Sequence, residues 1–299
     1  MERRRVVEVF LVVIALAAVL LSVGYTVSKT PATAESSTSE SAKKGVRTVN
    51  FNPTVARLER GRYLVEGPAH CFQCHSEVDW VNAGAQPKAG RKGAGTVFIE
   101  DGFEWLVAPN ITPDKETGAG KWTDEQFARA IREGIGHDGR RLFPIMPYMN
   151  FREMSDEDLA SVVVYIRSLD PVRNSLPKSI IPEPAKAHMP PHEPLTAAVP
   201  GPDMSDPVAR GKYLVTLGNC MTCHTPMSKN GPIKQLALAG GMTFTGAWGT
   251  VTSANITPDA SGISYYDEAM FVKTLRTGQV GARKLNSIMP WGYFRNMTD

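Results

Sequence analysis

All four cysteines of this chain lie in two pentapeptides of identical spacing. Residues 71–75 read Cys-Phe-Gln-Cys-His, and residues 220–224 read Cys-Met-Thr-Cys-His. Three chemistries compete for such a Cys-x-x-Cys pair: a redox-active dithiol, a zinc site and the covalent attachment of haem. A dithiol needs no histidine after it and is expected beside a βαβ pattern, which the sequence lacks. A zinc site made of all four cysteines would have to join two distant parts of the chain.

Covalent haem attachment gives the spacing a direct reason. Two thiols add to the two vinyl groups of one haem, and the histidine that follows then binds the iron. The sequence therefore predicts two covalently attached haem c groups. Their thiols would come from Cys71 and Cys74 and from Cys220 and Cys223, and their proximal iron ligands would be His75 and His224.

The two motifs belong to a longer internal repeat. Each follows a similar hexapeptide, and each precedes the same Asn-Ile-Thr-Pro-Asp run and a similar Ile-Met-Pro segment. The matched pairs are residues 60–65 with 210–215, 110–114 with 255–259, and 145–148 with 288–291. A repeat of this length indicates two copies of one module. We expect them at residues 55–170 and 205–299.

Proline dominates the segment between the copies, at residues 171–204. Nine prolines fall between positions 171 and 202, a density expected to exclude helix and to favour extended polyproline II structure. The segment is therefore predicted to be a semi-rigid strap whose stiffness could fix the distance between the modules.

The N-terminus predicts export. Three arginines at positions 3–5 precede a largely apolar run at residues 6–27, which as a helix would be long enough to cross a bilayer. The alternative is a cleaved signal peptide with a site near residues 32–34. Either interpretation places the body of the chain in the periplasm, and an uncleaved span would anchor it to the inner membrane. Residues 28–54 would form a flexible tether. The net charge of +3, without a basic stripe, gives no indication of nucleic-acid binding.

Helical signals predict an all-α fold: two tandem modules joined by the strap and preceded by the transmembrane helix. Thr123 to Gln126 has the pattern of a capping box that opens a helix, and its counterpart would open at Ser264. Ser155 is expected to cap a helix over residues 157–169. Asp299 aligns with Asp156, so the second module lacks this closing helix, and we expect the chain to be a fragment of a longer product.

The distal iron ligand is expected to be a methionine. Met146, Met149, Met154 and His137 are candidates in the first copy, and the second copy serves as an internal control. His137 aligns near Val280 and Met149 with Gly292, while Met154 directly precedes a helix cap. Met146 and Met289 are shared and precede proline, so we expect them to be the ligands. The alternative is that both only fill the core.

Other shared residues have weaker interpretations. Asn110 and Asn255 open the repeated turn, where they could either bind haem propionates or only stabilise the turn. Tyr148 and Trp291 are expected to pack on the haem edge. His70 has no counterpart and is expected to be a local surface group.

The motifs at these positions resemble the class I-like cytochrome c modules of the cytochrome subunits of bacterial membrane-bound alcohol, aldehyde and gluconate dehydrogenases. The resemblance covers roughly residues 55–170 and 205–299. It implies His75 and His224 as proximal ligands and Met146 and Met289 as distal ligands. Subunits of that kind often carry three haems and a C-terminal anchor, whereas this sequence has two motifs and an N-terminal apolar run.

The expected function is that of a membrane-tethered dihaem electron carrier and not an enzyme. It would relay single electrons between a donor and an acceptor as part of a respiratory or photosynthetic complex, with other redox proteins as its partners. Filled coordination positions on both irons would exclude catalysis. The alternative is a dihaem peroxidase, which needs one open iron.

The haem count is the first test of this scheme. A pyridine-haemochrome assay on the purified chain should give two covalent haems per polypeptide, because each pentapeptide supplies one attachment site. One haem, or none, would contradict the prediction.

Overall fold

A computed structural model of the chain describes residues 49–81, 84–98, 103–229 and 231–298. The expected membrane anchor at residues 6–27 lies outside these ranges, as does most of the expected tether. Among the described residues, no helix is both long enough and apolar enough to cross a membrane.

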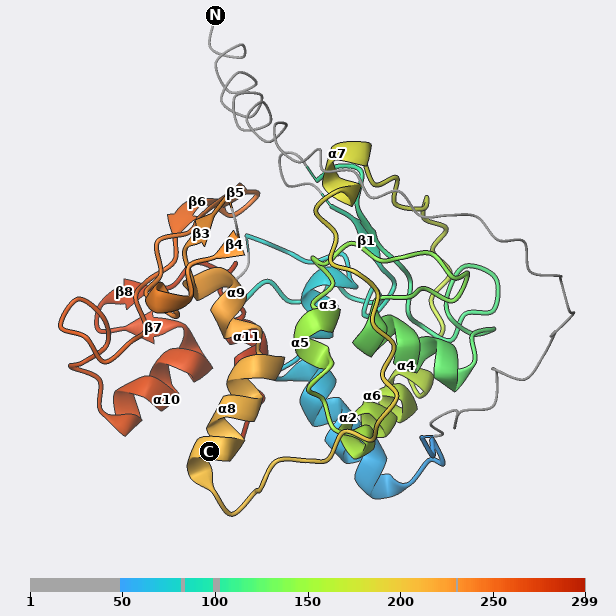
Figure 1. Ribbon diagram of the computed structural model, residues 1–299, viewed down its shortest axis with the longest axis horizontal. Helices are drawn as coiled ribbons and strands as arrows, with labels where there is room; N and C mark the ends of the chain where they lie inside the picture. Colours follow the sequence, from blue (N-terminus) through green and yellow to red (C-terminus); the bar gives the residue numbers. More distant parts are fainter. Residues whose placement is uncertain (1–48, 82–83, 99–102, 230, 299) are drawn as a thin grey trace, which may run out of the picture.

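Helices provide most of the framework, and the elements follow a similar order in the two parts of the chain (Figure 1). The first part contains α2 (Val55–Glu66), α3 (Cys71–Cys74), α4 (Asp124–Glu133), α5 (Tyr148–Phe151) and α6 (Asp156–Arg167). The second contains α8 (Pro207–Leu217), α9 (Cys220–His224), the 3-10 turn η1 (Lys234–Leu236), α10 (Glu268–Thr277) and α11 (Trp291–Phe294). The expected module boundaries at 55–170 and 205–299 bracket these two sets.

Short antiparallel strand pairs correct the expected all-α class to a mostly helical fold with some strands. Threonine and valine, which are stiff at χ1 and favour extended backbone, occupy many of their positions. The pairs are β1 (Thr96–Val97) with β2 (Val107–Ala108), β3 (Met227–Ser228) with β4 (Gly231–Pro232), β5 (Thr243–Gly246) with β6 (Gly249–Thr252), and β7 (Gln279–Val280) with β8 (Arg283–Lys284).

The tightest helix contact joins α2 to α6 and depends on Gly61. A Cβ atom at this position would lie 2.0 Å from the carbonyl oxygen of Ser161 and 2.6 Å from the Cβ of Tyr165. Leu64 and Val65, on the same helix, are completely buried. The missing side chain lets the two helices approach closely enough to bury this apolar face.

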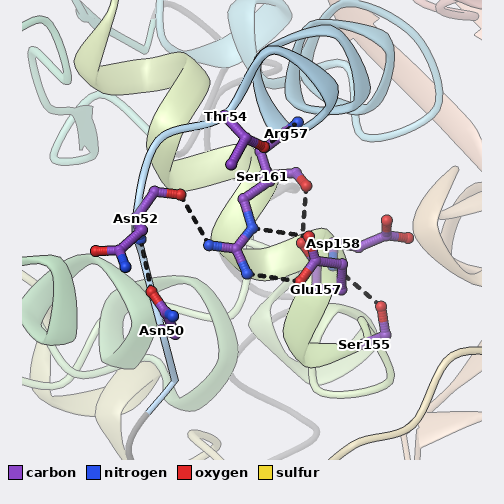
Figure 2. A network of polar contacts seen from close by, with 8 residues as sticks. All are labelled: Asn50, Asn52, Thr54, Arg57, Ser155, Glu157, Asp158 and Ser161. Atoms are coloured by element: carbon purple, nitrogen blue, oxygen red, sulfur yellow. Dashed lines mark hydrogen bonds and ion pairs between the residues drawn. The ribbon is translucent and has the colours of Figure 1, made fainter.

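Polar contacts reinforce the same pair of helices at one end (Figure 2). Arg57 binds Glu157 through two hydrogen bonds of 2.7 Å and also donates to the carbonyl of Asn52 at 2.8 Å. Ser155 caps α6 as expected, because its hydroxyl oxygen accepts from the backbone N–H of Asp158 at 3.1 Å. The two-point ion pair fixes the rotation of α2 against α6 more strictly than apolar packing alone would.

The two middle helices test the capping signals. The capping box of Thr123 and Gln126 is present in full at the start of α4. The expected start of its counterpart at Ser264 is wrong, because the carboxylate of Asp267 accepts from the N–H of Met270 at 2.7 Å and α10 begins at Glu268. Aspartate at the N-cap accepts this bond as serine would, so either residue could have opened the helix.

The proline strap lies along the first part of the chain. Its backbone bonds to that part at Val172, Ile180 and Val199, for example Ile180 N to the carbonyl of Trp105 at 3.1 Å. The expectation that the strap excludes helix is wrong at α7 (Glu183–Lys186). Pro184 stands in its first turn, where a missing N–H leaves no helical bond unmade.

One buried cluster runs through both parts of the chain. Tyr213 and Leu217 of α8 and Tyr293 of α11 pack with the core residues of α2 and α6. The Tyr213 hydroxyl donates to Asp158 at 2.7 Å and accepts from the N–H of Ser155 at 3.0 Å. Burial and the neighbouring carboxylate raise the pKa of Tyr213, so its hydroxyl remains a donor. The two parts therefore share a core.

The helix contact at Gly61 predicts unequal effects of one substitution at two matched positions. Gly61→Ala should lower the free energy of unfolding by about 1–3 kcal/mol, because the added methyl group has no room against α6. Gly211 is its counterpart on α8, and nothing lies within 4 Å of a Cβ built there. Gly211→Ala should therefore raise stability by up to about 1 kcal/mol through helix propensity. Urea unfolding of both variants followed by circular dichroism measures this, and equal losses would refute the packing argument.

Candidate functional site

Each cysteine motif begins at a left-handed residue. His70 (φ 34°) precedes α3, and Asn219 (φ 55°) precedes α9. Histidine and asparagine are among the few non-glycine residues that adopt this conformation readily. The left-handed residue follows the end of a long helix, α2 or α8, and starts a single helical turn, so the two cysteines of each motif lie on one short helix with the histidine at its end.

His75 and His224, which follow the second cysteine of each motif, are oriented by the same kind of backbone contact. The Nδ1 atom of His75 lies 2.9 Å from the carbonyl oxygen of Pro109, and that of His224 lies 2.7 Å from the carbonyl oxygen of Ala254. A carbonyl only accepts, so Nδ1 carries the proton and donates it, which leaves the lone pair of Nε2 for a metal. A backbone carbonyl behind a ligating histidine is a common second partner in metal sites.

Sequence reasoning missed Pro109 and Ala254, although a signal was present. Each directly precedes the repeated Asn-Ile-Thr-Pro-Asp run. The residue before the run returns its carbonyl to the histidine, 34 residues beyond His75 and 30 residues beyond His224. The contact uses only the backbone carbonyl, so the two positions can hold different residue types. For this reason a comparison of the two copies does not reveal them.

Burial keeps the functional groups of both motifs neutral. It raises the pKa of the Cys71 thiol to about 12 and that of Cys220 to about 11, with the neighbouring cysteine of each motif adding to the effect. It also lowers the pKa of His75 and His224. Reactive dithiols need thiolates with lowered pKa values. The two thiols with raised pKa values fit redox chemistry poorly, and the neutral imidazoles suit a metal ligand.

The structure separates the candidate distal ligands. Met146 and Met289 are half-buried in matching loops, each followed by a one-turn helix. In both loops the backbone turns back on the methionine carbonyl, with Tyr148 N at 2.7 Å and Trp291 N at 2.8 Å. Cys71 and Met146 both lie against the same buried cluster.

The other candidates are used elsewhere. The side chain of Met149 is 49% exposed, while Met154 is 1% exposed and belongs to the core. The ring of His137 stacks on Trp122 with centroids 4.4 Å apart. Gly292 stands where Met149 does because a Cβ at that position would meet the Gly84 carbonyl oxygen at 2.1 Å. The second copy therefore has glycine at this position because a side chain would not fit against Gly84.

Tyr148 and Trp291 hold the ends of the middle helices. Both are buried, and each ring lies against a left-handed glycine that ends a helix: Gly134 after α4 and Gly278 after α10. A Cβ at either glycine would lie within 2.6 Å of the aromatic ring. These contacts join each methionine loop to the helix before it. The expected packing of both rings on the haem edge stays a prediction.

Asn110 and Asn255 have the contacts of the structural alternative. In both, the side-chain oxygen accepts from the backbone N–H and the hydroxyl of the threonine two residues on. The amide of Asn110 donates to the strap at Val172 O, 2.7 Å away, and that of Asn255 donates to Ser261. The polar side-chain atoms of both asparagines therefore have protein partners already. The expected bonds to haem propionates stay a prediction.

Haem c fits the residues present. Each part of the chain offers two thiols, an imidazole with Nε2 available, and a thioether. Among the described residues, three buried donors near the methionine loops also lack a protein acceptor: Arg140 Nη1, Trp248 Nε1 and Trp291 Nε1. Buried donors without partners are costly, and the carboxylates of a haem would supply acceptors of the right charge and size.

His70 corrects the expectation of a local surface group. Its Nδ1 lies 2.8 Å from the carbonyl of Pro68, and its ring meets the ring of Phe294 on α11 edge-on, with centroids 5.6 Å apart. The residue therefore lies in the contact between the two parts of the chain. It lacks a counterpart because that contact is not symmetric.

The chain is similar in sequence to known cytochrome c proteins. The cytochrome c family matches residues 58–170. The gluconate 2-dehydrogenase cytochrome c subunit of Pantoea cypripedii is 32% identical over 243 residues, which is 75% of this chain and 52% of that protein. The cytochrome c subunit of the quinone alcohol dehydrogenase of Gluconobacter oxydans is 31% identical over 239 residues, 75% of this chain and 48% of that protein.

A smaller relative extends the comparison. A protein named diheme cytochrome c-type from Cereibacter sphaeroides is 29% identical over 201 residues, which is 63% of each chain. The chain spans about half the length of the two dehydrogenase subunits it matches.

The methionine assignment can be tested by removing one side chain at a time from the haem-loaded chain. Met146→Ala should remove about half of the methionine–iron absorption band, and Met289→Ala the other half, because each supplies one thioether. Met149→Ala, whose side chain is half exposed, should leave the band intact. Visible absorption of the oxidised protein measures this, and a loss in Met149→Ala without one in Met146→Ala would reverse the assignment.

Proposed function

We propose that this chain, whose residues 58–170 form a cytochrome c domain, is a two-haem electron carrier that serves as the cytochrome subunit of a larger oxidoreductase complex. The observation that carries the proposal is the shared placement of His75 and His224, each fixed through Nδ1 by a backbone carbonyl. Relatives named as cytochrome c subunits of dehydrogenases support the same role.

The residues of the chain perform three tasks in this function. Four cysteines hold the two haems covalently, so the carrier cannot lose them. The carbonyls of Pro109 and Ala254 keep each imidazole in one tautomer and orientation. Met146 and Met289 supply soft sulfur ligands, which favour a higher reduction potential than a second histidine would. The haem iron supplies the one-electron chemistry.

Electron transfer is favoured over catalysis. A peroxidase needs an iron with an open position, whereas the two methionine loops have the same backbone bonds and comparable burial. The relatives named as cytochrome c subunits also support a role that is not enzymatic. The chain would pass single electrons from a dehydrogenase or membrane donor to an oxidase, a reaction centre or a soluble acceptor.

The proposal includes a periplasmic location with a membrane tether. The apolar run at residues 6–27 after three arginines supports an anchor on the inner membrane. The tether would keep the carrier close to its partners and raise their effective concentration.

Carbon monoxide separates the relay from the peroxidase. In the reduced two-haem protein we expect little binding of the gas, because a histidine and a methionine fill both positions on each iron. Rapid mixing with a one-electron donor should reduce both haems, and a soluble cytochrome acceptor should reoxidise them. A haem that binds carbon monoxide readily, together with turnover of hydrogen peroxide, would overturn the relay in favour of the peroxidase.

A further inference from the structure

The two parts of the chain meet where their functional loops lie. Helices α3 and α5 of the first part face α9 and α11 of the second (Figure 1). The side chain of Asn150 on α5 bonds to that of Asn219 before α9, and Phe294 on α11 meets His70 before α3. Each attachment helix therefore contacts the segment that follows the other part's methionine.

One contact in this region joins the first attachment motif to the second methionine loop. Gln73 stands between Cys71 and Cys74, and its side chain is 8% exposed. Its Nε2 donates to the backbone carbonyl of Ile288 at 3.2 Å. Ile288 directly precedes Met289, so the donor holds the peptide group that leads into the expected distal ligand.

The rest of that loop is also held from the first part of the chain. The N–H of Ile288 donates to the side chain of Asn286, whose amide in turn donates to the carbonyl of Trp248 at 2.8 Å. The Trp248 ring meets that of Trp80, with centroids 4.7 Å apart. The loop before Met289 is thus linked to the first part of the chain directly through Gln73 and indirectly through Trp80.

The counterparts of Gln73 and Ile288 are used differently. Thr222 occupies the position of Gln73 in the second motif, and its hydroxyl donates to Asn219 within its own turn. The side chain of Ile145, the counterpart of Ile288, is 39% exposed. The first attachment helix therefore reaches the second methionine loop, while the second attachment helix uses its polar side chain locally.

We propose that Gln73 is a positioning residue for Met289, holding the ligand loop of the second haem from within the attachment motif of the first. This inference rests on the proposed haem ligation. Because a hydrogen bond to a partly buried carbonyl favours one loop conformation, its loss should raise the fraction of the second haem from which methionine has dissociated. The attachment motif of the first haem would then support the ligand loop of the second, whereas Thr222 in the second motif bonds within its own turn.

Imidazole, which competes with methionine for the iron, measures the effect. In the full haem-loaded chain carrying Met146→His, the remaining methionine band reports on Met289 alone. Adding Gln73→Leu to this background should lower the imidazole concentration for half-displacement by roughly 2- to 12-fold, the ratio that one net hydrogen bond supplies. The midpoint potential of the second haem should fall as well, since methionine ligation raises it.

The reciprocal background is the first control. With Met289→His, the remaining band reports on Met146, and Gln73→Leu should leave its imidazole titration unchanged. An equal shift in both backgrounds would mean that Gln73 supports the fold in general, and a shift confined to the Met289→His background would mean that it only packs its own site; either result overturns the proposal. No shift in the Met146→His background would overturn it too.

A second glutamine of the same interface provides a matched control variant. Gln86 donates to the carbonyl of Gly292 at 3.0 Å, beyond Met289 and outside its loop. Gln86→Leu should leave the Met289 titration unchanged, and a shift as large as that of Gln73→Leu would show a general loosening of the interface and refute the specific role. Gln73→Glu, which keeps the length but loses the donor when ionised, replaces the leucine variant if that one fails to load two haems.

The outcomes keep this inference apart from the proposed function. If the Met146→His background shows no methionine band before Gln73 is changed, the ligand scheme itself fails. A band that is present but insensitive to Gln73 leaves the two-haem carrier intact and rejects only the positioning role.

Discussion

The rest of the structure depends on one hydrogen bond in each part of the chain. It joins the ring of His75 or His224 to a backbone carbonyl. It requires that a chain segment 34 residues beyond His75, and 30 beyond His224, return to the motif. The Asn-Ile-Thr-Pro-Asp turn makes that return rigid, because the asparagine oxygen closes the turn on its threonine. In the first part the strap then closes over the same turn at Val172. The repetition of this turn in the sequence therefore reflects one hydrogen bond to each imidazole.

Symmetry of sequence does not extend to symmetry of contacts. Three matched positions show the difference: His70 with Asn219, Gln73 with Thr222, and Met149 with Gly292. In each pair the residue types differ where the two parts of the chain touch, while the neighbouring cysteines and histidines and the methionines expected as ligands are identical. The two motifs need the same residues because they are expected to perform the same chemistry. The contact between the two parts of the chain needs different side chains on each side.

The sequence predicted the elements that rest on local chemistry and missed those that rest on contacts across the chain. The attachment motifs, the cap at Ser155 and the capping box at Thr123 follow from side chains within a few residues of one another. The expected start of α10 at Ser264 is wrong, because serine and aspartate cap a helix equally well and only the path of the backbone decides that Asp267 is the cap. Pro109, Gln73 and His70 act through partners that are 34, 215 and 224 residues away, which no local pattern encodes.

The shared core changes the interpretation of the proline strap. A stiff linker was expected to fix the distance between the modules, yet its backbone bonds run to the first part of the chain, at Trp105, Thr112 and Asp156. The two parts meet directly through Tyr213, Leu217 and Tyr293, which are buried with residues of α2 and α6. Since packed cores resist small displacements, the separation of His75 from His224 is set by this cluster. The strap instead covers the turn behind His75, so its rigidity supports the first motif, while the core sets the distance between the two motifs.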